Sequence, residues 1–424
     1  MTNERSGANA HLYDVAVVGA GPAGSATATH LARAGLDVAL VDRATFPRDK
    51  PCAEYLSPAV EPLLANLGAL AAVEATHPAR LRGFRVFAPD GRMFQGDFAG
   101  VRGDDSTANG TSSAFETGLA VPRTILDAAL VDAARDAGAE ARENWRLSAI
   151  NWDATKRAWR LSATRAGGEE SISARILIGA DGVHSLVARR LGLRLEARTR
   201  KIAIVAHLRG IEGLSEYGEM HVANRRYVGI APMEPPSDTA RCNVAMVVDE
   251  RREGRALAGK PQEYLLEALS TFPRLRGRVG ALTVVRPALT ASRLSSRVRR
   301  RSAEAALLVG DAAGYYDPFT GEGIYHALRS AQIASSVIVE ALAAGDVSAS
   351  AFNRYDRMSA AAFRGKRTVE LAVQAAVQSP ALMSHIAARL EKRKSLADTL
   401  VAVTGDYLSP AAVLRPGYLL RLAL

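Results

Sequence analysis

The chain has 424 residues, of which 48% are hydrophobic, and a formal net charge of +10. This length and composition exclude a disordered chain and are typical of a soluble globular protein with roughly two or three domains. No apolar run approaches the ~18 to 20 residues of a membrane span, and the polar start, residues 1–11, lacks the apolar core of a secretion signal. We therefore expect a cytoplasmic protein.

The charge, the cysteines and the histidines give no sign of a nucleic-acid or metal partner. Nearly all basic residues are arginine and alanine is frequent, so we attribute the charge to a compositional bias, with attraction of an anionic partner as the alternative. The two cysteines, Cys52 and Cys242, do not form a Cys-x-x-Cys pair. The eight histidines are scattered without ligand spacing, so we predict no structural metal.

The N-terminal segment predicts a βαβ unit. Residues 13–19 form a short valine-rich run, typical of a strand buried on both faces of a parallel sheet. Residues 23–34 carry the small and apolar residues of a packed helix, which Gly35 ends. Residues 37–41 predict a second buried strand. Strand, glycine-rich turn, helix and strand together have the size of a βαβ unit.

The turn of this unit fits the Gly-x-Gly-x-x-Gly fingerprint of dinucleotide-binding proteins. Gly19 makes the tight turn, Gly21 lets the backbone approach a pyrophosphate, and Gly24 permits close packing of the helix. The start of the helix offers free N–H groups to the phosphates. An acidic residue after the second strand, Asp42, suits an unphosphorylated ribose and favours FAD or NAD over NADP. We expect cofactor contacts from Gly19, Gly21, Pro22, Ala23, Gly24, Asp42 and Arg43.

The rest of the chain predicts further strands and a helical end. The expected elements are an amphipathic helix at 123–137, hairpins at 144–175, a buried strand at 176–179, antiparallel strands within 202–249, a buried strand at 305–309, a long helix at 324–344, and helices from about 348 with breaks at Pro380, Pro410 and Pro416.

Three later motifs decide which dinucleotide is bound. They are Gly179-Ala180-Asp181-Gly182-Val183-His184-Ser185, Gly310-Asp311-Ala312-Ala313-Gly314 and Asp317-Pro318-Phe319-Thr320-Gly321-Glu322-Gly323-Ile324-Tyr325. With these motifs the sequence resembles the para-hydroxybenzoate hydroxylase superfamily of flavoproteins and, within it, the geranylgeranyl reductase family, over essentially residues 12–345. The resemblance implies that FAD is the cofactor and that Asp311 bonds its ribityl chain. It also implies that Asp181 lies between FAD and the nicotinamide donor.

The last motif has a clear physical use. A helix that begins near Gly323 points unpaired N–H groups at the flavin pyrimidine ring, where reduction leaves negative charge. Glycines at 321 and 323 permit close approach of the backbone. Arg123 matches the family's arginine near the ribityl chain. The resemblance therefore adds these cofactor contacts: Cys52, Arg123, Asp181, Gly310, Asp311, Pro318, Gly321, Gly323 and Ile324.

The expected fold is α/β, a Rossmann-like FAD-binding domain with a three-layer, mostly parallel sheet, an antiparallel β-sheet substrate domain and a C-terminal helical region. We predict a discontinuous FAD-binding domain from residues 12–75, 113–193 and 284–345. The substrate domain comprises 76–112 and 194–283, and the helical region 346–424. Only one dinucleotide fingerprint is present, so NAD(P)H is expected to dock transiently as the reductant, or another protein reduces the flavin.

The segment that ends in Cys52 is close to the family's sequence on the reactive side of the flavin, but the next residues depart from it. Ala53-Glu54-Tyr55-Leu56-Ser57-Pro58 replaces the usual glycines. Glu54 then orients a phenol or accepts its proton, unless Cys52 and Glu54 only pack. Tyr227 lies on a strand that faces the substrate in the family, although a tyrosine in a sheet more often packs. The catalytic candidates are Cys52, Glu54, Tyr55 and Tyr227.

Two enzyme activities and one binding function follow from the resemblance. The favoured one is a monooxygenase that hydroxylates an aromatic or lipophilic secondary metabolite through a flavin C4a-hydroperoxide. The alternative is a reductase that delivers hydride to an isoprenoid or other C=C bond while Cys52 or Tyr55 donates a proton. Rab GDP-dissociation inhibitors share the fold without flavin, but the Arg123 and Asp311 segments argue against a binding protein. Halogenation is not expected, because Trp-x-Trp-x-Ile-Pro is absent.

The apolar C-terminal end, residues 418–424, predicts a packed helix, with a pocket cover or peripheral membrane contact as alternatives. The sequence leaves the oligomeric state open.

Overall fold

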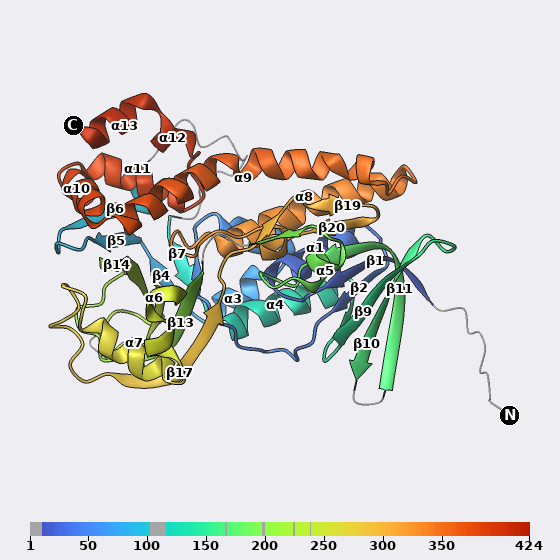
Figure 1. Ribbon diagram of the computed structural model, residues 1–424, viewed down its shortest axis with the longest axis horizontal. Coiled ribbons are helices and arrows are strands. Elements are labelled where there is room, and N and C mark those ends of the chain that lie inside the picture. The colour runs from blue at the N-terminus through green and yellow to red at the C-terminus, as the bar shows by residue number, and fades with distance from the viewer. Residues whose placement is uncertain (1–10, 102–115, 166–167, 197–199, 224, 238) are drawn as a thin grey trace.

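The computed structural model describes residues 11–101, 116–165, 168–196, 200–223, 225–237 and 239–424. The polar start up to residue 10 and the domain boundary predicted between residues 112 and 113 lie outside these ranges. Two large sheets lie side by side, a long helix runs past both, and the C-terminal helices cover the second sheet (Figure 1).

The first sheet has eight strands and contains the βαβ unit. Its path is β19-β20-β11-β1-β2-β8, and β10 and β9 continue as hairpins from β11. β1 pairs in parallel with both β2 and β11, and β11 with β20, as buried strands joined by helices do. The strands are β1 (Leu12–Val18), β2 (Val38–Val41), β8 (Glu140–Arg142), β9 (Arg146–Asp153), β10 (Ala158–Arg165), β11 (Gly168–Gly179), β19 (Ser302–Ala303) and β20 (Ala306–Leu308).

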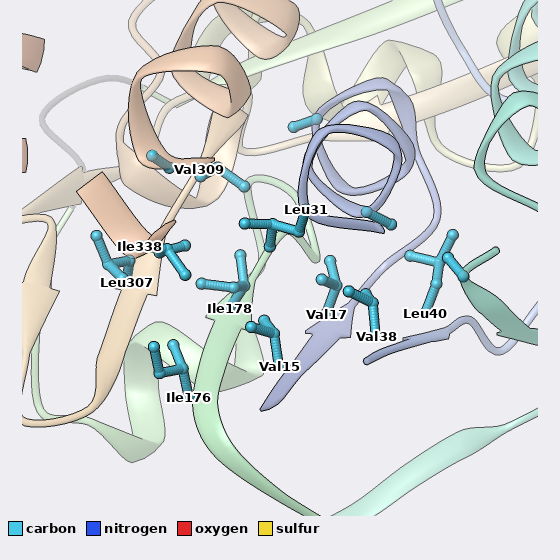
Figure 2. Close-up of a cluster of buried hydrophobic side chains, with 14 of the residues drawn as sticks. Val15, Val17, Leu31, Val38, Leu40, Ile176, Ile178, Leu307, Val309 and Ile338 are labelled. Carbon is cyan, nitrogen blue, oxygen red and sulfur yellow. The ribbon is translucent and has the colours of Figure 1, made fainter. Parts of the chain in front are cut away.

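Alternate residues of β1 enter two different cores, so the strand is apolar from Val15 to Val18. Val15 and Val17 face helices α1 (Pro22–Arg33) and α8 (Gly323–Ala343), where Leu31 and Ile338 cover the sheet (Figure 2). Ala16 and Val18 face the hairpin strands and the buried Trp145. Each fully buried aliphatic side chain contributes about 1.5 to 3 kcal/mol, which holds the three layers together.

The second sheet has seven strands in the order β17-β13-β16-β15-β14-β5-β6. All neighbours are antiparallel except β14 and β5. Its strands are β5 (Gly83–Phe87), β6 (Met93–Asp97), β13 (Lys201–Arg209), β14 (Tyr217–Ala223), β15 (Arg226–Pro232), β16 (Cys242–Asp249) and β17 (Thr283–Ser292). Smaller sheets are formed by β3 (Tyr55–Leu56), β7 (Gly118–Ala120) and β4 (Ala79–Leu81), and by β12 (Arg194–Leu195) and β18 (Arg297–Val298).

Helices cover both faces of this sheet. Helices α6 (Glu250–Leu257) and α7 (Pro261–Leu269) pack on one face, against alternate residues of β13 such as Ile204 and Leu208. The C-terminal helices pack on the other face, against Val205 and its neighbours. They are α9 (Ala349–Gln378), α10 (Pro380–Glu391), α11 (Lys394–Thr404), α12 (Ala411–Leu414) and α13 (Pro416–Ala423). Proline begins two of them because the first helical position needs no N–H donor.

The remaining helices are α2 (Val60–Leu67), α3 (Leu70–Glu74), α4 (Arg123–Asp136), α5 (Leu186–Arg190), and the 3₁₀ turns η1 (Phe98–Gly100) and η3 (Gly310–Ala313). In the part of the chain that the structure describes, no helix is both long and apolar enough to cross a membrane. The predicted fold class is confirmed: a mostly parallel Rossmann-like sheet, an antiparallel sheet and a helical C-terminal region. The division into three domains stays a prediction.

Candidate flavin and substrate site

The glycine turn at the carboxyl end of β1 is packed too tightly for any other residue. A Cβ atom on Gly24 would lie 1.7 Å from the carbonyl oxygen of Gly19. Gly19 has a φ of +103°, and its own Cβ would lie 2.5 Å from the carbonyl oxygen of Ala180. Helix α1 then begins with Gly21 as N-cap and Pro22 at its start, without a side chain that caps its N–H groups. This helix end is suited to an anion such as a pyrophosphate.

Asp42 stands beside this turn, where β2 ends. Its carboxylate accepts hydrogen bonds from the backbone N–H groups of Ala20 (2.7 Å) and Ala44 (2.8 Å). These two bonds fix the carboxylate against the glycine turn, and each oxygen keeps a further lone pair for a ribose hydroxyl. Arg43 follows directly and its side chain is exposed.

Basic side chains gather next to the glycine turn around one buried carboxylate. Arg123, the first residue of α4, makes a bidentate pair with Asp127 through two hydrogen bonds of 2.8 Å. Arg48 also contacts Asp127 at 3.0 Å, and it lies 3.5 Å from the Cβ position of Gly21. Burial opposes the charge of Arg123, but Asp127 and Cys52 outweigh it and raise the pKa of the guanidinium. The two arginines remain charged beside the phosphate turn.

Asp311 belongs to the same place. Burial raises the pKa of Asp311, and Lys50 and Arg123 oppose that rise. The pKa of Lys50 is lowered, first by burial and second by the positive charge of Arg123. The turn that carries Asp311 also contacts helix α1, because a Cβ on Gly310 would lie 2.7 Å from the Cβ of Ala23. Motifs from opposite ends of the chain therefore meet at one site.

The start of α8 completes this site. Gly321 has a φ of +74°, and a Cβ there would lie 2.7 Å from the ring of Tyr55. Next to Gly323 only the ring of Tyr315 is near, 3.7 Å from the Cβ position. The N-cap residue Glu322 makes no capping bond with its side chain, so the first N–H groups of α8 have no cap. Pro318 lies in the loop that precedes the helix, and Ile324 is buried in its first turn.

Asp181 lies after β11, next to the glycine turn of β1. It accepts hydrogen bonds from the N–H groups of Leu186 (2.6 Å) and Val187 (3.2 Å), while its Oδ1 atom is buried without a partner. A Cβ on the following residue, Gly182, would lie 3.7 Å from Nζ of Lys50. Two uncapped helix starts, close-packed glycines, basic side chains and an unsatisfied carboxylate oxygen together fit FAD.

Glu54 is the centre of a second, buried network. One of its oxygens lies 2.6 Å from His207 Nε2 and accepts a bond from Asn243 (2.8 Å). The other accepts bonds from Arg286 (3.1 Å) and the backbone N–H of Arg123 (3.2 Å). Burial would raise the pKa of Glu54, but these donors, His207 first, outweigh it and lower the pKa.

An apolar cavity of about 170 Å³ lies between the second sheet and the C-terminal helices. Its wall includes Phe319 and Thr320, which belong to the loop before α8, so the cavity adjoins the flavin side of the molecule. Sheet residues and helices α9 to α13 supply the rest of the wall, among them Phe84, Val86, Met220, Val373, Val401 and Leu419.

The sequence matches the FAD binding domain family over residues 12–368, which is most of the chain. The chain belongs to this family. It is 31% identical to the digeranylgeranylglycerophospholipid reductase of Methanosarcina acetivorans over 348 residues, 80% of this chain and 77% of the reductase. It is 32% identical to the menaquinone reductase of Mycobacterium tuberculosis over 350 residues, 77% of this chain and 76% of that protein.

A solved flavoprotein/dehydrogenase from Cytophaga hutchinsonii shares the fold, with a TM-score of 0.78, 18% identity, and coverage of 94% of this chain and 93% of that one. The chain is therefore an FAD-dependent oxidoreductase of the geranylgeranyl reductase family, within the para-hydroxybenzoate hydroxylase superfamily. The family assignment made from the sequence motifs is confirmed.

Within this flavoprotein, the four catalytic candidates lie in different surroundings. Cys52 is partly exposed, accepts a bond from the N–H of Glu54 (3.3 Å), and is a hydrogen-bond partner of Arg123. Tyr55 is buried against Phe84 at the cavity wall, and its hydroxyl has no partner. The hydroxyl of Tyr227 is occupied, because it donates to Asp317 at 2.7 Å.

The sequence analysis did not single out several residues of the site. Asp127 follows Arg123 by four residues, so helical spacing alone pairs the two charges. Arg48 and Lys50 lie in the segment that ends in Cys52, but no pattern in the neighbouring sequence indicates that their side chains reach the flavin site. His207, Asn243 and Arg286 come from three strands of the second sheet, and no motif near them indicates that they converge on Glu54.

Proposed function

We propose that this flavoprotein is a reductase that saturates C=C bonds of a lipophilic, isoprenoid-like substrate. The observation that carries the proposal is the apolar cavity beside the flavin loop. Among its described lining residues, the hydroxyls of Thr404 and Tyr418 are already bonded to backbone carbonyls, and only Thr320 has a buried hydroxyl without a partner. Such a cavity suits a hydrocarbon and offers little to orient a phenol.

The size of the cavity favours one part of a long substrate. A cavity of about 150 Å³ holds a benzene molecule, so the 170 Å³ present here accepts one isoprene unit or a ring. The remainder of a polyprenyl chain must lie outside. Leu419 lines the cavity and is 48% exposed, and Leu420 on the same helix and Leu424 just after it are exposed as well. These leucines support peripheral contact with a membrane that supplies the substrate.

Glu54 also supports the reductase. The family usually carries glycine in this segment, and Glu54 has a φ of +57°, a conformation that favours glycine. The altered sequence therefore keeps, at Glu54, the left-handed backbone conformation that glycine adopts readily. Hydroxylation was favoured because of the altered segment after Cys52, in which Glu54 could orient a phenol. Both carboxylate oxygens of Glu54 already have partners, so they are not free for that role.

Cys52 is the proton donor that the geometry favours. Bound reduced FAD supplies hydride to one carbon of the double bond, or activates O₂ in the alternative monooxygenase. Cys52 is partly exposed, and its Sγ atom accepts the N–H of Glu54 and interacts with Arg123 of the flavin site. It delivers a proton to the second carbon, and Arg123 stabilises the thiolate that remains.

NAD(P)H is proposed as the source of the hydride. The first sheet contains one glycine-rich βαβ turn, and FAD fills it. A nicotinamide nucleotide therefore docks transiently and leaves after reduction of the flavin.

The test is turnover with NADPH under anaerobic conditions, compared on a geranylgeranyl lipid, a polyprenyl quinone and a phenolic lipid. The reductase predicts saturated product without oxygen, and Cys52→Ala is expected to lower turnover at least about 100-fold while flavin reduction by NADPH persists. Tyr227→Phe is the matched control, because its hydroxyl is bonded to Asp317. Product that contains an atom from O₂, with none formed anaerobically, contradicts the reductase and establishes the monooxygenase.

A further inference from the structure

We propose that Glu322, His326 and Glu370 bind one divalent transition-metal ion where α8 meets α9. One ligand atom of each residue lies within 4.8 Å of the others. Glu322 and His326 are four residues apart at the start of α8, so they share one face of the helix, and Glu370 reaches the same point from α9. No structural metal was expected from the sequence, because the histidines are scattered without ligand spacing; the grouping becomes visible only when α8 and α9 come together.

Glu322 and His326 each have a buried side-chain atom without a hydrogen-bond partner among the described residues. Glu322 is only 4% exposed, and its Oε2 atom has no hydrogen-bond partner among the residues that the structure describes. The Nε2 atom of His326, also without a partner, lies 3.8 Å from this oxygen. Ligands on a tetrahedral metal stand about 3.3 Å apart, so a small movement brings both onto one ion. A buried carboxylate oxygen without a donor is otherwise costly.

The charges around this cluster also call for a cation. Lys366 lies beside the cluster. Its Nζ atom lies 3.6 Å from Glu322 Oε1, and it forms a closer ion pair with Asp406. The ammonium group of Lys366 thus faces the carboxylates of Glu322 and Asp406. Lys366 and Arg367 both act against burial to lower the pKa of Glu370. Burial raises the pKa of Glu370 to about 7, with Asp317 as the next cause, and burial raises the pKa of Glu322 well above its usual value. A metal ion replaces the protons that these carboxylates otherwise hold.

His326 is already in the form that binds a metal. Burial, and then Lys366 and Arg301, lower the pKa of His326 to about 3, so the imidazole is neutral at physiological pH. Its ring packs against Phe363, which fixes its orientation. A neutral imidazole with two carboxylates is a set of nitrogen and oxygen ligands for Zn²⁺ or Mn²⁺, whereas Mg²⁺ and Ca²⁺ prefer oxygen alone.

A second cavity gives the ion a route from solvent. It has a volume of about 330 Å³, and its wall includes His326 and Glu370 together with Arg297, Arg301, Arg364 and Arg367. Water in this cavity completes the coordination. Glu322 directly follows Gly321 of the flavin loop and adds to burial in raising the pKa of Tyr55, so a bound ion ties the start of α8, beside this catalytic candidate, to α9.

The first experiment measures metal binding to the FAD-loaded protein. After treatment with EDTA and desalting, we expect one equivalent of Zn²⁺ by calorimetry and one of Mn²⁺ by loss of the aqueous electron-spin-resonance signal. Binding releases protons and weakens as the pH falls from 8 to 6, because Glu370 must ionise. His326→Gln and Glu370→Gln are each expected to weaken binding at least 10-fold.

The control variant is His385→Ala, which removes an exposed histidine of α10 that lies outside the cluster and should leave binding unchanged. A second measurement does not depend on variants that fold: bound Mn²⁺ in the unaltered protein should show magnetic coupling to one histidine nitrogen. The proposal is overturned if the unaltered protein binds neither ion, if the coupling is absent, or if folded His326→Gln and Glu370→Gln bind as tightly as the unaltered protein.

Discussion

Glu54 and Glu322 are both buried carboxylates beside the flavin loop, 1% and 4% exposed. Their pKa values are nevertheless shifted in opposite directions. Glu54 receives bonds from donors that include His207 and Arg286, and its pKa is lowered. Glu322 is near one ammonium group, that of Lys366, which Asp406 also binds, and its pKa is raised well above the usual value. Burial acts in the same direction on both, so the number of donors and cations within reach decides the outcome.

The same isosteric substitution at the two positions should separate them, and Glu54→Gln has the larger effect. It removes a charge that Arg286 and the other donors require, and breaking such a buried pair costs about 3 to 5 kcal/mol of unfolding free energy. Urea unfolding of the FAD-free protein measures it. Glu340→Gln, which removes an exposed pair with Arg354, should change stability by less than about 1 kcal/mol. Equal losses of unfolding free energy in Glu54→Gln and Glu340→Gln would show that the buried pair contributes no more than the exposed one.

The pH dependence of stability should have opposite slopes for the two clusters. Glu370, next to Glu322, has a folded pKa of about 7 against 4.5 unfolded, so the folded state holds the extra proton between these values. The unfolding free energy of the metal-free protein should therefore fall as the pH rises from 4.5 to 7, by about 2 to 3 kcal/mol relative to Glu370→Gln. Glu54 contributes in the opposite sense, because its lowered pKa means that its stabilisation is lost as the pH falls below about 4.5.

These profiles come from urea titrations at intervals of half a pH unit with metal chelated. Parallel profiles for the unaltered protein and Glu370→Gln would show that Glu370 titrates normally. Saturating Zn²⁺ should remove the difference if the ion takes the place of the proton.

Glu322→Gln should change the unfolding free energy of the metal-free protein by less than about 1 kcal/mol. Burial raises the pKa of its carboxyl well above the usual value, which favours the neutral form, and an amide keeps the volume of that form, so little is lost. Lys366 retains Asp406 as its partner. A loss as large as that of Glu54→Gln would mean that Glu322 is ionised and well paired.

The smallest effect is expected for Tyr55→Phe. The hydroxyl of Tyr55 is buried without a partner, and removing it relieves a desolvation cost, so stability should be unchanged or rise by about 1 kcal/mol. If Cys52 donates the proton, turnover also stays within about threefold. A 100-fold loss of turnover with unchanged stability would assign the proton to Tyr55 instead.

The flavin half of the molecule was predictable because its motifs are local. The motifs are the turn at Gly19, the Asp311 turn and the loop before α8. Each is a contiguous segment in which glycine is needed for a left-handed backbone conformation or for close packing. Parallel strands also bring their carboxyl ends to one edge, so motifs far apart in sequence were expected to meet. Helix α4 begins at Arg123, where proline ends the preceding strand, as the sequence indicated.

The substrate half was predictable only as strands and helices. The partners of Glu54 come from β13, β16 and β17, and their convergence depends on the pairing register of an antiparallel sheet, which a single sequence does not specify. The wall of the apolar cavity combines that sheet with helices that begin some 100 residues later. The Glu322 cluster was hidden for the same reason, since two of its members are neighbours on α8 and the third lies on α9.

The interleaving of the two sheets has a consequence for synthesis on the ribosome. β5 and β6 emerge early and pair with each other, but β5 must wait for β14, more than 100 residues later, before it gains its second neighbour. In the first sheet, β1 pairs early with β2 but waits for β11, and β11 waits for β20. Neither sheet is complete until most of the polypeptide has left the exit tunnel. The nascent chain therefore exposes unpaired strand edges for a long interval, and such edges favour aggregation until their partners arrive.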